Sequence, residues 1–413
     1  MNEIKLYPHQ QKALDITKNK NKVAYYLDMG LGKTFVATEK AKQLGSNIIL
    51  VVCQKSKLED WKVHYEEYYK EYTPIIYKNI LQQIKPNTVV IINYDLLPKR
   101  EELKKLKDFT LILDESSYIK NEKALRTKFI LRLNPQNIIL LSGTPTGGKY
   151  EELYSQIKLL GWNITKTQYW NEYINYMLCL DGGRKFTKIL GYKNVERLKR
   201  KLREHGAVFM KTDEVFELPD VFENIIKVKN IKEYKIFNRD RIVEIEDEEL
   251  VGDTVLTKML GLRQLAGLYN KNKYEKLKEL LESTEDRIII FYNYKDECIK
   301  IKEICNKLHK PMAVVNGDKR DLEAYENNDN AVTLIQYQAG AMGLNLQKSN
   351  KIIYFSLPLS SELFEQSKKR THRIGQNRAC SYYYLITEKS IEEKIFDTLK
   401  MRRDYTEALF KEQ

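Results

Sequence analysis

The chain has 413 residues, the size of two or three ordinary domains, and 42% of them are hydrophobic, so it is not a disordered protein. Its net charge of +13 favours an anionic partner, most commonly nucleic acid, although a lysine-rich proteome gives the same balance. Its five cysteines form no C-x-x-C pair and, with its five histidines, give no zinc pattern, so we expect a reducing compartment. The first residues lack an apolar signal core, and every apolar run is too short to cross a bilayer, so we expect a soluble cytoplasmic protein with no membrane partner.

The segment LYPHQQKALD near the start reads as a helix that begins at Pro8. The amide of Gln10 in this helix can both donate to and accept from the edge of an adenine base. Without further context, an exposed helical glutamine is the alternative.

The stretch DMGLGKT follows a short apolar run and precedes a helical segment, which is the context of a phosphate-binding loop. Gly30 and Gly32 can turn several N–H groups inward, where they and the helix dipole hold a polyphosphate. Lys33 is placed to reach the β- and γ-phosphates, and Thr34 offers a hydroxyl to Mg²⁺. The general pattern has its first glycine where this chain has Leu27, so a chance glycine-rich turn is the alternative.

Almost continuously aliphatic runs predict strands that are buried on both faces of a parallel sheet. In the first part of the chain these runs are Val23–Leu27, Ile48–Cys53, Val89–Ile92, Leu111–Leu113 and Ile138–Leu141. Helix candidates lie between them at Lys57–Lys70, Lys99–Lys107 and Glu122–Leu133. We therefore expect an α/β lobe that binds its ligand at the carboxyl ends of the strands.

Two further strand ends carry polar residues suited to chemistry. Asp114 and Glu115 follow a buried run in LILDESSYIKN. Asp114 can hold Mg²⁺, and Glu115 can orient and deprotonate the water that attacks a γ-phosphate. The small residues Ser142 and Thr144 leave the next strand in IILLSGTPTGG, where a loop can sense the γ-phosphate, although such residues also make ordinary turns.

The middle of the chain loses this rhythm of strands and becomes aromatic and basic. Basic side chains mixed with Trp162, Trp170 and several tyrosines could follow a phosphate backbone, and a solvated helical face over an aromatic core is an equally good interpretation. We expect a helical insertion here. The predicted division is residues 1–160 for an N-terminal ATP-binding lobe, 161–285 for the insertion, and 286–413 for a C-terminal lobe with a terminal helix.

The last part of the chain again predicts an α/β lobe. Buried runs recur in RIIIFY, PMAVV, AVTLIQ, KIIYF and SYYYLIT, and a long helix follows from Ile391 to about Phe410. In EQSKKRTHRIGQ, the spacing of Gln366, Arg370 and Arg373 puts the two arginines on one face of a helix or of its terminal turn. Arginines there could stabilise charge on a transferring phosphate, whereas alone they would be surface or DNA-facing charges.

Together these motifs resemble the Swi/Snf family of ATP-dependent DNA translocases, in helicase superfamily two. The resemblance covers nearly the whole chain, and it rests on LYPHQ, DMGLGKT, VVCQKSKLEDW, LILDESSYIKN, LSGTPTGGKYEELYSQ, QAGAMGLNLQ and EQSKKRTHRIGQ in the family's order. The last motif is the most specific. The family also lacks the first glycine of the general phosphate loop, which accounts for Leu27.

The resemblance implies two RecA-like lobes with parallel sheets flanked by helices, and ATP with Mg²⁺ in the cleft between them. In the first lobe it implies that Gln10 reads adenine, that Gly30, Gly32, Lys33 and Thr34 bind phosphate and Mg²⁺, and that Asp114 and Glu115 serve hydrolysis. In the second lobe it implies that Arg373 is the main arginine finger with Arg370 in support. Gly343 and Asn345 would sense the nucleotide.

The chain departs from the family at several positions. Ser117 replaces a histidine that helps to couple hydrolysis to DNA, and Leu359 replaces a tryptophan before the last motif. Histone-binding modules do not fit in this length, so we expect a compact bacterial or bacteriophage translocase, associated with the nucleoid or, if phage-encoded, in the host cytoplasm. Duplex DNA bound without sequence preference is the expected partner, and a recruiting protein is unknown. A strand-separating DNA or RNA helicase is the second hypothesis, weakened because the sequence shows no obvious wedge hairpin. A non-hydrolysing, ATP-regulated binding module is the third.

Overall fold

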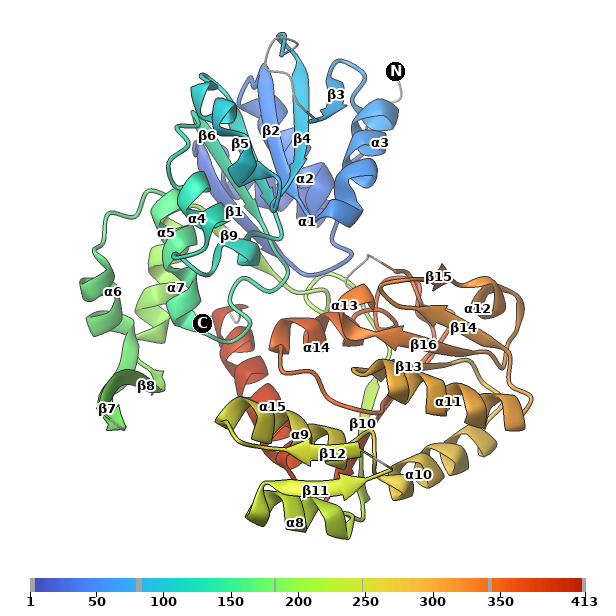
Figure 1. Ribbon diagram of the computed structural model, residues 1–413. Helices are drawn as coiled ribbons and strands as arrows, with labels where there is room; N and C mark the ends of the chain where they lie inside the picture. Colours follow the sequence, from blue (N-terminus) through green and yellow to red (C-terminus); the bar gives the residue numbers. More distant parts are fainter. Residues whose placement is uncertain (1–3, 79–83, 182, 247, 341–343, 411–413) are drawn as a thin grey trace. The chain divides into compact units, whose positions relative to one another are not determined.

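Aliphatic runs form the strands of two large sheets in the computed structural model, which describes residues 4–78, 84–181, 183–246, 248–340 and 344–410. The chain divides into two units. The first holds the residues up to Phe216 together with those from Asp404 onward, and the second is Glu217–Arg403. Each unit has a sheet of mostly parallel strands with helices on its faces, as Figure 1 shows. The expected α/β class, with two lobes of parallel sheet flanked by helices, is confirmed.

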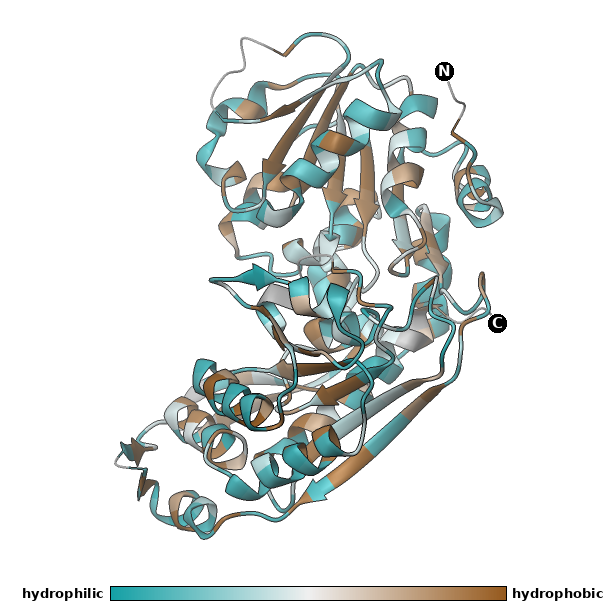
Figure 2. Ribbon diagram, turned by 90° about the vertical axis from the view of Figure 1, so that its right-hand side faces the viewer, coloured by the Kyte–Doolittle hydropathy of each residue, from teal (hydrophilic) through white to brown (hydrophobic). Residues whose placement is uncertain are grey.

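The sheet of the first unit is entirely parallel. Its strands, in spatial order, are β3 (Thr73–Ile76), β4 (Thr88–Asn93), β2 (Ile48–Cys53), β5 (Thr110–Asp114), β6 (Asn137–Leu141), β1 (Lys22–Leu27) and β9 (Ala207–Met210). All five predicted strands of this lobe are present. Their hydrophobic character is visible as brown arrows in Figure 2, beneath helices that are partly hydrophilic.

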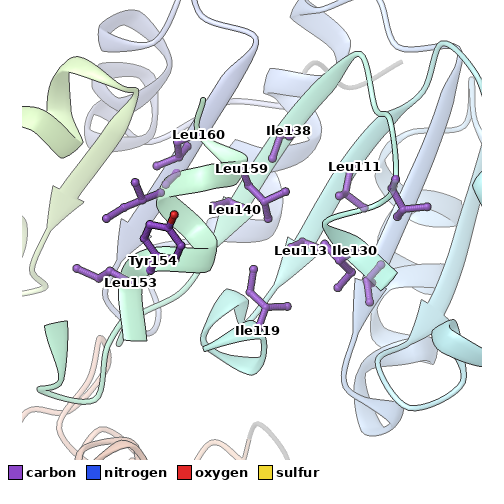
Figure 3. Packing of buried hydrophobic residues seen from close by; sticks show 14 of the residues in the cluster. Leu111, Leu113, Ile119, Ile130, Ile138, Leu140, Leu153, Tyr154, Leu159 and Leu160 are labelled. Atoms are coloured by element: carbon purple, nitrogen blue, oxygen red, sulfur yellow. The ribbon is translucent and has the colours of Figure 1, made fainter. Parts of the chain in front are cut away.

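Alternate residues of β5 and β6 point to opposite faces of this sheet, as the period of a strand requires. Figure 3 shows one face, on which lie Leu111, Leu113, Ile138 and Leu140. The residues between them, Ile112 and Ile139, join a second cluster on the other face. Burial of each such side chain stabilises the folded state by about 1.5–3 kcal/mol. The two clusters together therefore hold in place the strands that carry the predicted site.

The helices of the first unit cover these two faces. They are α1 (Pro8–Ile16), α2 (Lys33–Gln43), α3 (Leu58–Tyr68), α4 (Leu125–Ile130), α5 (Tyr154–Leu159), α6 (Lys166–Tyr173), α7 (Val195–Glu204) and the end of α15 (Ile391–Phe410). Short 3₁₀ turns are η1 (Lys55–Lys57), η3 (Leu97–Lys99), η4 (Glu101–Lys105), η5 (Ser116–Ile119) and η6 (Tyr150–Leu153). The helix predicted at Lys99–Lys107 is therefore wrong: two short 3₁₀ turns occupy this part of the chain, because Pro98 and the left-handed backbone of Asp108 interrupt a longer helix.

The sheet of the second unit is parallel except for one edge strand. In spatial order its strands are β10 (Val221–Val228), β18 (Cys380–Thr387), β17 (Lys351–Tyr354), β13 (Ile288–Tyr292), β16 (Val332–Gln336), β14 (Met312–Val315) and the antiparallel β15 (Arg320–Asp321). Its helices are α8 (Lys232–Asp240), α9 (Val255–Ala266), α10 (Lys271–Glu282), α11 (Lys295–Lys307), α12 (Glu323–Asn327), α13 (Tyr337–Gly340), α14 (Ser361–Lys368) and most of α15.

The region from 161 to 285, expected as a helical insertion, contains strands as well as helices. β9 completes the first sheet, β10 begins the second, and the units divide between them after Phe216. Two antiparallel hairpins also lie here, β7 (Ile174–Asp181) with β8 (Arg184–Tyr192), and β11 (Ile242–Ile245) with β12 (Glu248–Val251). Their side chains are largely exposed, so these strands lack the continuous apolar runs by which the others were predicted.

Across the ranges that the structure describes, no helix combines the length and the apolar character needed to span a bilayer.

Candidate active site

The predicted phosphate-binding loop joins β1 to α2, which is the strand-to-helix position that the sequence predicts for it. Gly30 and Gly32 have φ values of 90° and 71°, a conformation that suits glycine. A Cβ atom at Gly32 would also lie only 2.1 Å from Nε2 of Gln10. Glycine is therefore required at position 32 for two reasons, the left-handed backbone conformation and the close approach of Gln10. Nζ of Lys33 donates to the carbonyl oxygens of Leu27 (2.9 Å) and Asp28 (3.1 Å), which holds the ammonium group within the loop.

Gln10 lies beside this loop and closes the first turn of α1. Its Oε1 accepts from the backbone N–H of Tyr7 (2.9 Å), and its Nε2 donates to the carbonyl oxygen of Leu31 in the loop (3.3 Å). A cavity of ≈ 290 Å³ adjoins it, with mostly apolar walls formed by Ile4, Lys5, Leu6, Tyr7, Gln10, Phe35 and Tyr68. An apolar cavity with one amide at its edge suits a flat heterocyclic base.

The acidic pair lies at the carboxyl end of β5, on the same edge of the sheet as the phosphate-binding loop. Nε1 of Trp61, in α3, donates to Oδ2 of Asp114 (2.9 Å), which orients this carboxylate. Glu115 has a φ of 54°, and a non-glycine residue held in this region costs about 1–3 kcal/mol. The hydroxyl of Tyr94 donates to the carbonyl oxygens of Asp114 (2.9 Å) and Glu115 (3.4 Å), which helps to hold the strained turn.

The loop after β6 meets the acidic pair. Oγ of Ser142 donates to Oε2 of Glu115 (3.4 Å) and accepts from the backbone N–H of Thr144 (3.1 Å). A Cβ atom at Gly143 would lie 3.6 Å from Nζ of Lys33. The strand order β5–β6–β1 thus brings three loops of the first unit together around Lys33 and Glu115.

Gln156 of α5 is a residue that sequence reasoning missed. Its Oε1 accepts from Oγ of Ser116 (2.8 Å) and from the hydroxyl of Tyr26 (2.9 Å), and its Nε2 donates to the carbonyl oxygen of Pro145 (2.8 Å). This one amide therefore connects the loop after β5 to the loop after β6. Its only signal was its place at the end of LSGTPTGGKYEELYSQ.

His64 packs α3 against α2 behind the acidic pair. Its Nε2 lies 3.1 Å from Oγ1 of Thr38, its ring contacts that of Trp61, and burial lowers its pKa to about 4. In the unfolded chain the pKa is near 6.5, so between these values the unfolded state binds more protons. Stability contributed by neutral His64 is complete above pH 6.5 and is lost as the pH falls towards 4.

We expect acidification from pH 7.5 to 4.5 to lower the free energy of unfolding of the first unit by on the order of 3 kcal/mol through His64 alone. Urea unfolding followed by tryptophan fluorescence measures this, because Trp61, Trp162 and Trp170 are the three tryptophans and all lie in that unit. The variant His64→Asn, which has no proton to gain, is the comparison. Equal losses in both proteins would refute the assignment.

In the second unit, Arg373 and Asn345 lie together. NH1 of Arg373 donates to Oδ1 of Asn345. Burial lowers the pKa of the Arg373 guanidinium, so its charge is partly desolvated and would gain from an anionic partner. Gly343, the other residue expected to sense the nucleotide, lies outside the described residues.

Arg370 and Arg373 do not share an exposed face. α14 ends at Lys368, so both arginines lie in the turns that follow it. Arg370 is only 2% exposed, its NH1 donates to the carbonyl oxygen of Leu344 (3.4 Å), and its own carbonyl accepts from the N–H of Leu346 (3.1 Å). It packs the loop before Asn345 rather than presenting charge to solvent.

The segment with these arginines is tied to the start of the second unit. Nε2 of His372 lies 2.8 Å from the carbonyl oxygen of Pro219. Oε1 of Glu223, in β10, accepts from Nζ of Lys368 (2.8 Å) and from NH1 of Arg403 (3.2 Å). The segment that carries Arg373 is therefore fixed to β10 and to the residues just before it, and Arg370 in this segment holds the loop before Asn345.

The aromatic and basic region of the middle separates into two sets of residues. Tyr169 and Tyr173 are fully buried in the core of the first unit, as one interpretation expects. The exposed residues of the hairpin include Tyr176, Lys185 and Lys188. The structure thus places some of these aromatic residues in a core, and whether the exposed ones follow a phosphate backbone stays a prediction.

Two protein-family models and several known proteins match this chain. A model of the SNF2-related domain matches residues 20–315, and a model of the helicase conserved C-terminal domain matches residues 272–375. The chain is 23% identical to the SWI/SNF-related matrix-associated actin-dependent regulator of chromatin subfamily A-like protein 1 homolog of Caenorhabditis elegans, over 97% of this chain and 61% of that protein. It is 23% identical to an uncharacterized ATP-dependent helicase of Mycoplasma pneumoniae, over 89% of this chain and 38% of that protein. Among solved structures it is similar to the Sulfolobus solfataricus SWI2/SNF2 ATPase core in complex with dsDNA, with a TM-score of 0.47, 22% identity, and coverage of 99% and 92% of the two chains.

The chain therefore spans less than two thirds of the length of either of these two relatives.

Proposed function

The chain belongs to the SNF2-related domain family, and we propose that it is a motor that hydrolyses ATP while it moves along duplex DNA. The observation that carries this proposal is the meeting of three loops in the first unit, where Lys33, Glu115 and Ser142 come together. The net charge of +13 supports a polyanionic substrate.

Each residue of the first unit then has a chemical task. The loop N–H groups and Lys33 bind the phosphates, and the apolar cavity beside Gln10 takes the adenine base. Thr34 and Asp114 offer the hydroxyl and carboxylate oxygens that Mg²⁺ prefers, and Trp61 already engages Oδ2 of Asp114, leaving Oδ1 for the metal. When bound, Mg²⁺ neutralises charge on the phosphates.

Glu115 acts as the base for the attacking water. Ser142 orients one of its carboxylate oxygens, and the strained backbone fixes the direction of the side chain. From the second unit, Arg373 stabilises the charge that develops on the γ-phosphate. Before ATP binds, the side chain of Asn345 accepts a hydrogen bond from this arginine and holds it in position. Arg370 supports this loop from within the core.

The first experiment is phosphate release with Mg²⁺-ATP in the presence of no nucleic acid, duplex DNA, single-stranded DNA or RNA. We expect duplex DNA to stimulate turnover most. The variant Lys33→Ala should bind ATP at least about tenfold more weakly, because the loss of one charged hydrogen bond is worth about 1.5–3 kcal/mol. Turnover that neither duplex DNA nor this substitution changes would overturn the proposal.

DNA binding without sequence preference follows from a motor that grips phosphates, since phosphate contacts carry no sequence information. Competition between unrelated duplexes of equal length tests this directly. Such a motor works where the DNA is, so we place it at the nucleoid of a bacterial cytoplasm or of a phage-infected host.

Strand separation is the second candidate function. The structure contains an exposed hairpin, β7–β8, and an exposed hairpin is the kind of element that can act as a wedge between strands. The sequence did not reveal this hairpin. A strand-displacement assay on tailed duplexes separates this candidate from simple translocation, because a translocase without unwinding activity displaces a triplex-forming strand but leaves the duplex intact.

A further inference from the structure

The β7–β8 hairpin exposes apolar side chains on both of its faces. In Figure 1 it projects from α6, away from the sheet of its own unit. Its exposed large hydrophobic residues are Tyr176, Met177, Leu178, Leu180, Phe186 and Leu190. Leu178 and Leu180, near the tip, are 71% and 70% exposed. A soluble surface gains nothing from such side chains, so this cluster indicates a binding surface.

The base of the hairpin is firmly held by aromatic contacts and a hydrogen bond. Tyr192 stacks on Tyr150 at 4.3 Å between ring centroids, and its hydroxyl donates to Oε2 of Glu151 (2.9 Å). The ring of Tyr176 lies edge-on to Trp170 at 5.4 Å. An isolated two-stranded hairpin is at best marginally stable in water. A binding partner would therefore stabilise the outer cross-strand pairs, from Met177 and Lys188 to Leu180 and Lys185.

The same outer cross-strand pairs contain the positively charged residues Lys185 and Lys188. In the register of the two strands, Met177 lies opposite Lys188 and Leu180 lies opposite Lys185. Within the described part of the chain, no carboxylate forms an ion pair with Lys185, Lys188 or the nearby Lys193. Lys185 thus shares one face of the hairpin with Leu178 and Leu180, and Lys188 shares the other face with Met177.

This pairing distinguishes between possible partners. An apolar protein surface that covered Leu180 would also desolvate the ammonium group of Lys185, which is costly without a counter-charge. Nucleic acid offers phosphates to the lysines and the apolar C–H faces of the adjoining sugars to the leucines. The major groove of a DNA duplex also admits a two-stranded ribbon.

We propose that the β7–β8 hairpin is a DNA-binding element that enters a groove of the duplex, with Lys185 and Lys188 on phosphates and Leu178 and Leu180 against the adjoining sugars. This inference rests on the proposed function in that it takes DNA as the substrate. It adds a contact on the first unit that none of the sequence motifs contains.

The test is the binding of a fluorescent duplex by the whole protein, without nucleotide, over a series of KCl concentrations. Each phosphate contact contributes about 0.9 to the slope of log K against log salt concentration. The double variant Lys185→Ala/Lys188→Ala should therefore lower that slope by about 1.8. The double variant Leu178→Ser/Leu180→Ser should bind more weakly at every salt concentration and keep the wild-type slope.

The matched control is Lys271→Ala/Lys307→Ala, which removes two exposed lysines from the second unit. It should keep the wild-type slope, and an equal fall in slope there would overturn the proposal by showing a general effect of charge. Wild-type slope and affinity in both hairpin variants would also overturn it. So would a change in oligomeric state of the leucine variant by light scattering, since the hairpin would then pair two copies of the chain.

The wild-type protein separates the failure of this inference from the failure of the proposed function. If it neither binds duplex DNA nor shows DNA-stimulated turnover, the function itself is wrong. If it does both while the hairpin variants bind as well as the wild type, only the inference about the hairpin is wrong.

Discussion

Replacing Arg373 by alanine should lower the rate of ATP hydrolysis by about 10³- to 10⁵-fold, the range that arginine fingers contribute. In its proposed role the guanidinium stabilises charge that appears on the γ-phosphate only in the transition state, so kcat should fall while the Kd for ATP changes little. In the free protein its partner is the neutral side chain of Asn345, so the substitution leaves no buried ion unpaired. Single-turnover hydrolysis and titration with a fluorescent ATP analogue measure the two quantities.

Arg370→Ala is the matched comparison, because it removes the same group three residues away. Arg370 is buried and its guanidinium holds the loop at Leu344, so we expect this variant, which loses that contact, to lose stability. Thermal unfolding should show a lower Tm for Arg370→Ala and an unchanged Tm for Arg373→Ala. A large loss of ATP affinity in Arg373→Ala would instead make that residue a ground-state binder.

Glu115→Gln should lower turnover by about 10²- to 10⁴-fold, the contribution of a positioned general base. The amide has almost the same shape, and its oxygen can still accept from Ser142, but it cannot take a proton from water. ATP and DNA should therefore still bind, and the complex with both should live longer than in the wild type. Phosphate release and the dissociation rate of labelled duplex in ATP report these two effects.

Gln156→Leu is the variant to compare with Glu115→Gln. This variant keeps Glu115 but removes the amide that connects Ser116 to Pro145, so it should weaken turnover less and should also lower stability. Turnover of Glu115→Gln close to that of the wild type would show that another group activates the water.

The strands of the central sheets were the most predictable part of the fold, because their signal is local. The run Ile48–Cys53 is buried on both faces, and the observed strand has the predicted bounds. β10 was not predicted, because Phe222 and Ile225 are exposed and its pairing partner is β18, far along the chain. Such a strand is defined by a partner that the segment itself does not reveal.

In the candidate site, too, the features with a local sequence signal could be predicted, and those that depend on distant segments could not. The glycines and Lys33 form a contiguous motif, so their loop could be predicted and is present. The bond from Trp61 to Asp114 and the burial of Arg370 against Leu344 depend on segments brought together by the sheets, and periodicity could not supply them. The catalytic and nucleotide-binding roles stay predictions until the variants above are measured.

The end of α15 has a consequence for the order in which the protein is completed. Phe410 is buried in the core of the first unit against Phe209, and the carbonyl oxygen of Tyr405 accepts from the hydroxyl of Tyr150. Residues 404–410 leave the ribosome only after the whole of the second unit has been made. Both cores therefore wait for the same helix, because α15 gives Ile395, Phe396 and Leu399 to the second unit and Phe410 to the first. The half of the chain that is translated first is thus completed only by the residues that are translated last.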